Sequence, residues 1–295
     1  MANPSICRLW RACTLLRGLT FEGYFAPYCR LRLLLNAAKT EWIWFGSRVN
    51  LARIPERFRS LQVRGSDIEC ADVVRDLGVY LDSELSMKNH VSKIASACFY
   101  HIRRLRQIRH YVSREVLKQL VTSLVLSRLD YCNSVLVGLP ASTLMPLQRA
   151  QNAAARLVLG LDRRSHTTAA LQDLHWLPVR HRITFKIASL MHQVLHQRCL
   201  TYLSDVVEFN SVGTQRRLRS TTTGAAVVRR TRTQFWRRGP SLFVVQTFGT
   251  LFPHAAIRTT DYYPAFRRSL KHTYFILLLT SSYSCFYVRQ LCWST

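Results

Sequence analysis

A stripe of apolar residues with helical spacing runs through the middle of the chain. Its members follow one another at intervals of one, three and four residues: Met87, Val91, Ile94, Ala95, Cys98, Ile102 and Leu105. The opposite side of the same stretch carries Lys93, Tyr100, Arg103 and Arg104. The pattern predicts a helix with one apolar face and one basic face that also bears an aromatic side chain. Such a basic face suits a phosphate backbone, and it also suits plain water, which is the commoner case for a single helix.

Helical patterns continue downstream of this stripe. A second helix is expected to begin after Ser113, a residue type that caps helix N-termini. A third helix is expected from about residue 142 to residue 159, ending at Gly160, because glycine readily takes the left-handed conformation that closes a helix. A fourth is expected to begin near Pro178. The region 87–200 is therefore predicted to be a bundle of at least four helices.

The chain before the stripe shows strand-like patterns instead. Residues 76–82 predict a short strand with a bend at Gly78. The aromatic run Trp42–Gly46 predicts another strand, and shorter strand-like pieces are expected at Ile54, around 61–63 and at Ile68, with a turn at Gly65. Together they predict one small sheet of three or four strands. The expected fold class is thus α+β and mainly α: a small N-terminal sheet, a helical bundle and a basic, partly irregular tail.

The tail is the most basic part of the chain. Between residues 215 and 271 the only acidic residue is Asp261. Arginines come in pairs and triplets and are interleaved with an aromatic residue, and the candidates for nucleic-acid contact are Arg216, Arg217, Arg219, Arg229, Arg230, Trp236, Arg237 and Arg238. The alternative is a solvated tail that contacts nothing.

The overall charge points in the same direction. The 295 residues include 42 Lys and Arg against 16 Asp and Glu, a formal net charge of +26. A polyanion is the natural partner of such a chain, with nucleic acid first and an anionic membrane surface second. A basic protein with no specific partner is the third interpretation.

The cysteines and the apolar segments bear on the compartment. Nine cysteines are scattered with irregular spacing and without a Cys-x-x-Cys pair, which indicates neither a disulfide framework nor a zinc site and favours a reducing compartment. The N-terminal region lacks the continuous apolar core of a secretory signal. The chargeless segment 273–288 is short and polar for a membrane span. The expected location is nuclear or cytoplasmic, not secreted.

No intact active site is visible in the sequence. It contains no adjacent aspartates that would hold two magnesium ions, no phosphate-binding glycine loop and no Gly-x-Ser-x-Gly motif. His192 and His196 have the spacing of two metal ligands on a helix, but the glutamate of a zinc protease is missing. We therefore predict no catalytic residue, no metal ligand and no cofactor in this chain.

A series of short motifs resembles the reverse transcriptases of LINE-type (non-LTR) retrotransposons, of the jockey and chicken-repeat branches. They occur in the family's order between about residues 31 and 272: Leu35-Asn36-x-x-Lys39-Thr40-Glu41 with Phe45-Gly46, Leu77-Gly78-Val79-Tyr80-Leu81-Asp82, His90-Val91-x-x-Ile94, Ser127-Arg128-Leu129-Asp130-Tyr131-Cys132-Asn133, Leu147-Gln148-Arg149-x-Gln151-Asn152-Ala153-Ala154-Ala155-Arg156, Leu174-His175-Trp176-Leu177-Pro178, Arg232-Thr233, Gly239-Pro240 and Phe266-Arg267.

This resemblance implies a domain organisation. Residues 1–30 stay unassigned, 31–86 would be a palm remnant with the strand leading into the thumb, 87–200 a helical thumb-like bundle, and 201–295 a basic C-terminal region, partly disordered. The family's catalytic centre, a Tyr-x-Asp-Asp turn and an earlier aspartate that hold Mg²⁺, would lie upstream of Lys39-Thr40-Glu41, and no residue there matches it.

The function that follows is that of a truncated RNA-directed DNA polymerase. The resemblance implies that this chain keeps the template–primer-binding part, contacts the backbone of RNA, DNA or their hybrid, takes no small-molecule substrate and is inactive as a polymerase by itself. Two alternatives remain: a stand-alone, sequence-independent nucleic-acid-binding protein, and a transposon relic without function.

Overall fold

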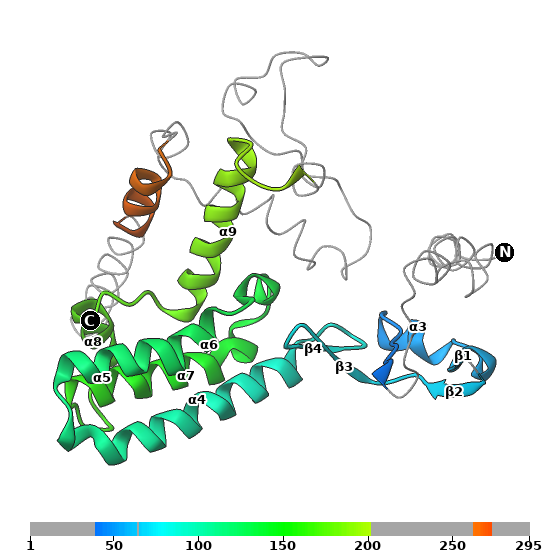
Figure 1. Ribbon diagram of the computed structural model, residues 1–295, viewed down its shortest axis with the longest axis horizontal. Helices are drawn as coiled ribbons and strands as arrows, with labels where there is room; N and C mark the ends of the chain where they lie inside the picture. The colour runs from blue at the N-terminus through cyan, green and yellow to red at the C-terminus, as the bar shows by residue number, and fades with distance from the viewer. Residues whose placement is uncertain (1–38, 64, 202–261, 273–295) are drawn as a thin grey trace, which may run out of the picture. The chain divides into compact units, whose positions relative to one another are not determined.

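The computed structural model describes residues 39–63, 65–201 and 262–272 (Figure 1). The fold is α+β and mainly helical, with two small β-hairpins on the N-terminal side of the helices. The elements are α3 (Arg48–Ala52), β1 (Ser60–Val63), β2 (Ser66–Glu69), β3 (Val73–Asp76), β4 (Val79–Asp82), α4 (Lys88–Ile108), α5 (Arg114–Val121), α6 (Ser127–Asp130), α7 (Ala141–Leu159), α8 (Thr167–Asp173), α9 (Val179–Leu195) and a last helix over 263–272.

The described residues fall into two compact units. One comprises 39–44 and 49–74, and the other comprises 45–48 together with the residues from 75 onward. The first unit is built on the antiparallel hairpin of β1 and β2, in which Leu61 pairs with Ile68. Gly65 has a φ of +79° at the turn of this hairpin, a conformation that favours glycine.

The prediction of a strand at Trp42–Gly46 is wrong. This run has no ladder partner in the described structure, and isolated main-chain bonds, such as that from the N–H of Ala71 to the carbonyl oxygen of Trp42 (3.0 Å), and side-chain bonds hold it instead. The indole N–H of Trp42 donates to the carbonyl oxygen of Ile68 (3.0 Å), and the indole N–H of Trp44 donates to that of Phe58 (2.9 Å). The aromatic residues that suggested a strand therefore act as side-chain anchors for an extended segment.

The prediction of one sheet of three or four strands is wrong as well. The strands form two separate two-stranded hairpins, β1 with β2 and β3 with β4. The turn between β3 and β4 places Leu77 (φ +44°) and Gly78 (φ +86°) at its centre. Two successive residues with positive φ give the turn type that matches the twist of a hairpin, so this pair of strands closes locally and needs no third strand.

Asp82, at the end of β4, holds the chain segment that leads into α4. One carboxylate oxygen of Asp82 accepts the N–H of Ser86 and the other accepts the N–H of Met87, both at 2.8 Å. Asp82 is only 8% exposed, and Met87 has a φ of +58° immediately before α4. The carboxylate thus satisfies backbone donors at the start of a 21-residue helix and sets its direction.

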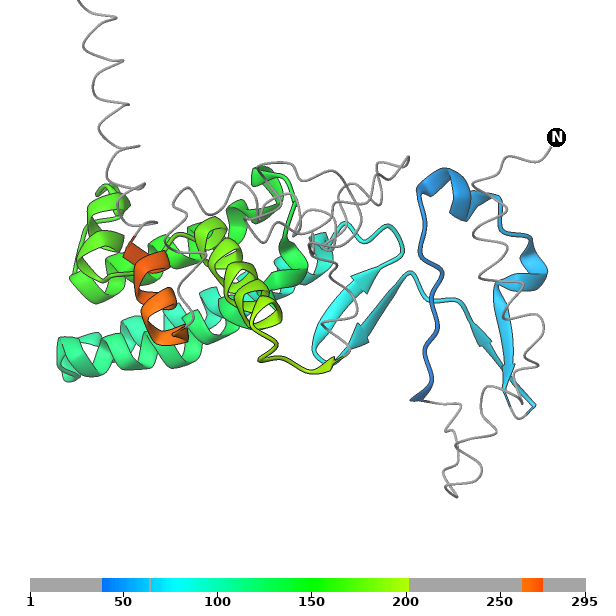
Figure 2. The same ribbon diagram turned by 90° about the horizontal axis from the view of Figure 1, so that it is seen from above.

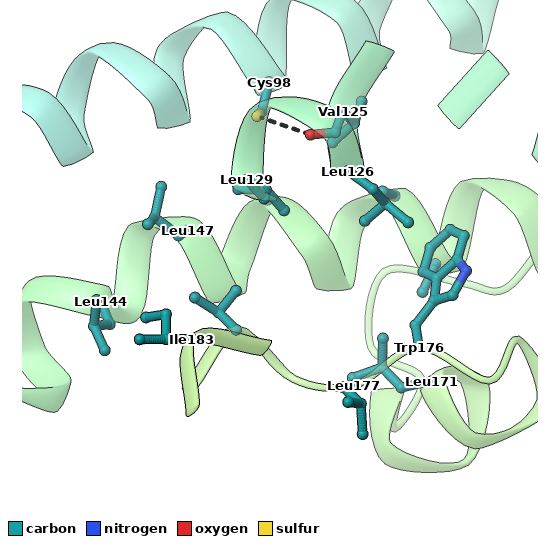
Figure 3. Close-up of a cluster of buried hydrophobic side chains, with 14 of the residues drawn as sticks. Cys98, Val125, Leu126, Leu129, Leu144, Leu147, Leu171, Trp176, Leu177 and Ile183 are labelled. Carbon is teal, nitrogen blue, oxygen red and sulfur yellow. Dashed lines mark hydrogen bonds between the residues drawn. The ribbon is translucent and has the colours of Figure 1, made fainter. Parts of the chain in front are cut away.

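The apolar stripe of α4 lies in the core, as predicted. Its buried members are Met87, Val91, Ala95, Cys98, Ile102 and Leu105, Ile94 is half-buried, and the polar His90 of the same helix is buried as well. Helix α7 packs beside α4, and Figure 3 shows Leu144 and Leu147 of α7 and Val125, Leu126 and Leu129 of the segment from α5 to α6 around this core. Cys98 is fully buried, its thiol lies 3.8 Å from the carbonyl oxygen of Val125, and burial raises its pKa to about 11. Cys98 is thus a core residue, as its place in the apolar stripe predicts.

The predicted helix ends are also confirmed. The hydroxyl of Ser113 accepts the N–H of Val116 at the start of α5, and Gly160 ends α7 with a φ of +71°. A π turn over Thr122–Leu126 joins α5 to α6. Helix α8 was not predicted.

Residues 263–272 are an ordered part of the basic C-terminal region, which was predicted to be partly irregular. They form a helix (Figure 2). Its Phe266 and Leu270 are 1% and 0% exposed. The ring of Phe266 stacks on His192 of α9 at a centroid distance of 3.8 Å. Apolar residues at 263, 266 and 270 have helical spacing, so the burial of one face offsets the ordering of this segment. The other residues of 201–295 lie outside the described part of the chain, apart from Thr201 and Tyr262.

Candidate nucleic-acid interface

Three cations and one tyrosine occupy the face of α4 that points away from the core, which we call the α4 face. Lys93, Arg103 and Arg104 are exposed, and Tyr100 is 51% exposed. The structure therefore brings these four predicted site residues together on one side of a single helix, opposite its buried stripe. Helix α4 contains no acidic residue, and none of the three cations forms an ion pair with another described residue. The face is a strip of uncompensated positive charge, the electrostatic property expected of a surface that binds a polyanion.

The charge of this face does not come from histidine. The ring of His101 stands edge-on to that of Tyr100 at a centroid distance of 5.4 Å. Burial, and in second place the positive charge of Arg128 on α6, lower the pKa of His101 below its ordinary value. His101 is therefore neutral at neutral pH, and lysine and arginine supply the positive charge.

A groove between α4 and α7 lies beside the α4 face. It has a volume of about 510 Å³, and apolar residues such as Ala95 and Phe99 line part of it. The cation Lys88 and the hydroxyl groups of Ser92, Ser96, Ser142 and Thr143 line the rest of the groove. Hydroxyl groups are common donors to phosphate oxygens in protein–nucleic acid complexes. The sequence interpretation missed these residues, although the spacing of four between Ser92 and Ser96 places both on one side of α4.

Several motif residues link separate elements of the helical unit. Arg182 of α9 donates from Nε to one carboxylate oxygen of Asp130 (2.7 Å) and from Nη2 to the other. The hydroxyl of Tyr131 donates to the carbonyl oxygen of Leu77, and its ring lies 3.4 Å from where a Cβ on Gly78 would stand. Two motifs that are separated by 54 residues in the chain are thereby joined.

A second set of motif residues joins α7 to the start of α9. The amide nitrogen of Gln151 donates to the carbonyl oxygen of Leu177 (2.8 Å), and the N–H of Val179 donates to the amide oxygen of Gln148 (2.9 Å). The two glutamines are also bonded to each other at 3.1 Å. Gln151 is fully buried, so its polar side chain needs these partners. No short-range pattern in the sequence pairs these positions.

The remaining candidates contribute nothing to a described site. Arg216, Arg217, Arg219, Arg229, Arg230, Trp236, Arg237 and Arg238 lie outside the described residues. His192 and His196 lie with ring centroids 4.3 Å apart, and His192 is buried beneath Phe266. Among the described residues there is no group of three His, Cys, Asp or Glu side chains that would hold a metal ion.

Comparisons with known proteins give no relative from which to transfer a function. No family model, no curated protein and no solved structure matches this chain. Over residues 39–63, 65–201 and 262–272, no helix combines the length and the apolar character needed to cross a membrane. The α4 face and the groove beside it are the features on which a function can be argued.

Proposed function

We propose that this chain carries the thumb-like, template–primer-binding part of a LINE-type reverse transcriptase, an RNA-directed DNA polymerase. The α4 face and the adjoining groove would hold a duplex or hybrid nucleic acid by its sugar–phosphate backbone. The motif resemblance supports the family, and the helical bundle that follows the β3–β4 hairpin is compatible with a thumb.

The observation that carries the binding proposal is the charge distribution on α4. A 21-residue helix that buries one side completely has five Lys or Arg residues and no acid on the rest of its surface. In an ordinary solvated helix, cations are balanced by acids three or four residues away, because such pairs stabilise the helix. Here Lys93 and Arg104 stand on the same side of the helix with no such partner, so their positive charge is free to attract an external polyanion.

The groove residues indicate which part of the nucleic acid would be contacted. Its hydroxyl groups at Ser92 and Ser96 lie on α4 next to Lys93, and those at Ser142 and Thr143 lie on α7. Hydroxyl donors beside cations suit phosphate and sugar oxygens, which are the same at every base pair. The proposal is therefore binding without sequence preference, with ordinary dissociation constants of about 10⁻⁴–10⁻⁶ M at physiological salt.

Polymerase chemistry is not part of the proposal. The intact family enzyme uses Mg²⁺ held by aspartates, whereas this sequence has no adjacent aspartates and the described residues offer no group of three ligands. The residues present do not fit that ion, and we assign no nucleotide-transfer step to them. A primer-extension assay with magnesium or manganese should show no template-dependent incorporation by the purified chain. Incorporation above the background of a mock purification would contradict this part of the proposal.

Matched variants test the binding proposal. Replacing Lys93, Arg103 and Arg104 together by Gln removes three charges from the α4 face. Replacing Arg180 and Lys186 of α9 and Arg268 of the last helix by Gln removes three equally exposed charges elsewhere. Fluorescence anisotropy with a labelled RNA–DNA hybrid should show a much larger loss of affinity for the first variant. Equal losses would mean that bulk charge, not the α4 face, attracts the nucleic acid.

A stand-alone nucleic-acid-binding protein would use the same surface. The reverse transcriptase interpretation adds a polymerase domain to this region, and the stand-alone interpretation does not. The anisotropy experiment above therefore supports or rejects the binding role in both cases.

A further inference from the structure

The end of the bundle farthest from β4 brings two basic loops together. Helix α4 ends at Ile108 and is followed by a 3₁₀ turn over Arg109–Tyr111, while α7 ends at Gly160 (Figure 1). A Cβ on Gly160 would stand only 2.6 Å from Nη2 of Arg109, so the arginine packs directly on the end of α7. Contact between these helix ends therefore fixes the position of the turn relative to α7.

The loop after α7 is also fixed. Both Nε and Nη2 of Arg156 donate to the carbonyl oxygen of Ser165, at 3.2 and 3.1 Å, which folds the loop 160–165 back onto the helix. Arg163 and Arg164 lie within this loop and are exposed. A hydrogen-bonded frame thus holds two arginines near the turn that follows α4.

We define the tip cluster as Arg106, Arg109, Tyr111, Arg114, Arg163 and Arg164. All except the half-buried Arg109 are exposed, and none of the cations forms an ion pair with another described residue. Two acids, Glu115 and Asp162, are nearby in the chain, so the cluster keeps a positive excess. Arg114 is placed in the first turn of α5, where the helix dipole disfavours a cation, so its position is not explained by helix stability.

Tyr111 is the unusual member of this cluster. Its side chain is 87% exposed, so neither its ring nor its hydroxyl is used in packing. Tyrosines on protein surfaces normally bury the ring and expose the hydroxyl tip. A ring that stands free among arginines offers a stacking surface for an unpaired base, with cations in reach of the flanking phosphates.

We propose that the tip cluster binds an unpaired nucleotide strand, with Tyr111 stacked on a base. This inference rests on the proposed function: the α4 face holds the duplex, and the tip takes a single strand that extends beyond it. Lys93 and Arg106 are separated by about 20 Å along α4 at 1.5 Å per residue, so the tip lies farther along the same helix that bears the α4 face. Ile108 and Leu161, which flank the cluster, are only 40% and 38% exposed, which is little apolar surface for membrane insertion.

The test compares two nucleic acids and three variants of the full chain. The probes are a blunt duplex and the same duplex with a short single-stranded overhang that contains 2-aminopurine. The variants are Tyr111→Ala, Tyr111→Phe and, as a matched control at another exposed tyrosine, Tyr262→Ala. Circular dichroism verifies that each variant is folded.

We expect Tyr111→Ala to weaken binding of the overhang substrate at least about fivefold, the lower end of base–aromatic stacking, and to leave blunt-duplex binding unchanged. It should also abolish the quenching of 2-aminopurine by the wild-type chain, while Tyr111→Phe and Tyr262→Ala keep both properties. If Tyr111→Ala binds the overhang substrate as tightly as the wild type, or loses equal affinity for both probes, the inference is overturned and the duplex proposal stands. Failure of the wild type to bind either probe would overturn both proposals.

The last measurement is binding to anionic vesicles of phosphatidylserine and phosphatidylcholine. Vesicle binding that depends on Tyr111, without any dependence of overhang binding on Tyr111, would assign the tip to a membrane and reject the nucleotide strand.

Discussion

The interior of the bundle and the α4 face use polar residues in opposite ways. Inside, Asp130 and Arg182 satisfy each other, and Gln148 and Gln151 bond to the backbone at the start of α9. On the α4 face, Lys93 and Arg104 have no described counter-charge. The motifs that suggested a family therefore report mainly on how the bundle is held together, whereas the residues between the motifs carry the capacity to bind. Fold and function are encoded by different side chains of the same helices.

The largest effect is expected where the last helix meets α9. Phe266 is 1% exposed and stacks on His192, so Phe266→Ala should lower the free energy of unfolding by about 3–5 kcal/mol. Arg268→Ala, on the exposed side of the same helix, should change it by less than about 0.5 kcal/mol. Chemical denaturation measures both. Equal stabilities of the two variants would mean that residues 263–272 are not part of the core.

The ion pair inside the bundle comes next. The side chains of Arg182 and Asp130 are 18% and 43% exposed, so Asp130→Ala leaves a largely buried guanidinium without its charged acceptor and should cost about 1.5–3 kcal/mol. Glu84→Ala removes the partner of Arg48 in a pair whose side chains are 40% and 89% exposed, and should cost about 0–1 kcal/mol. If the urea midpoints of the two variants coincide, the interior pair contributes no more than a surface pair.

A smaller, pH-dependent effect is expected at His90. Its Nδ1 accepts the N–H of Tyr80 (3.3 Å) in a buried position, and burial lowers the pKa of His90 below the ordinary value of 6.5. The unfolded chain therefore binds more protons below pH 6.5, and His90 contributes stability above that pH that is lost as the pH falls. This single group contributes a slope of at most about 1.4 kcal/mol per pH unit. Denaturation of wild type and His90→Gln between pH 7.5 and 5 should show a shallower loss for the variant, and parallel curves would exclude His90 as the source.

Short-range patterns predicted the helices well. The stripe from Val91 to Leu105 is buried, and the caps at Ser113 and Gly160 are found, because each depends on residues within one or two turns. The exposure of Lys93, Tyr100, Arg103 and Arg104 followed from the same periodicity, so that part of the candidate site was predictable.

Long-range contacts explain what was missed. The strand expected at Trp42–Gly46 is replaced by indole bonds to carbonyls 14 and 26 residues away, which no local propensity reveals. The pair of Asp130 and Arg182 spans 52 residues. The tip cluster exists only because α4 and α7 end beside each other, so its arginines come from two separate stretches of the chain, 106–114 and 163–164. The helix at 263–272 was overlooked although its apolar spacing is regular.

The triple variant of the α4 face should have the smallest effect on stability and the largest effect on nucleic-acid binding. The substitution of Lys93, Arg103 and Arg104 by Gln replaces exposed side chains and should change the free energy of unfolding by no more than about 0.5 kcal/mol per site. The interior variants should behave in the opposite way, losing stability while the folded protein keeps its salt dependence of binding.

The salt dependence of binding to an RNA–DNA hybrid tests the central claim most directly. The logarithm of the association constant falls linearly with the logarithm of the salt concentration, and each lost phosphate contact should make this slope shallower by about 0.9. The account predicts that the triple variant of the α4 face has a slope shallower by up to about 2.7, and that the matched triple variant at Arg180, Lys186 and Arg268 keeps a slope close to that of the wild type. Equal slopes for the two triple variants would contradict it.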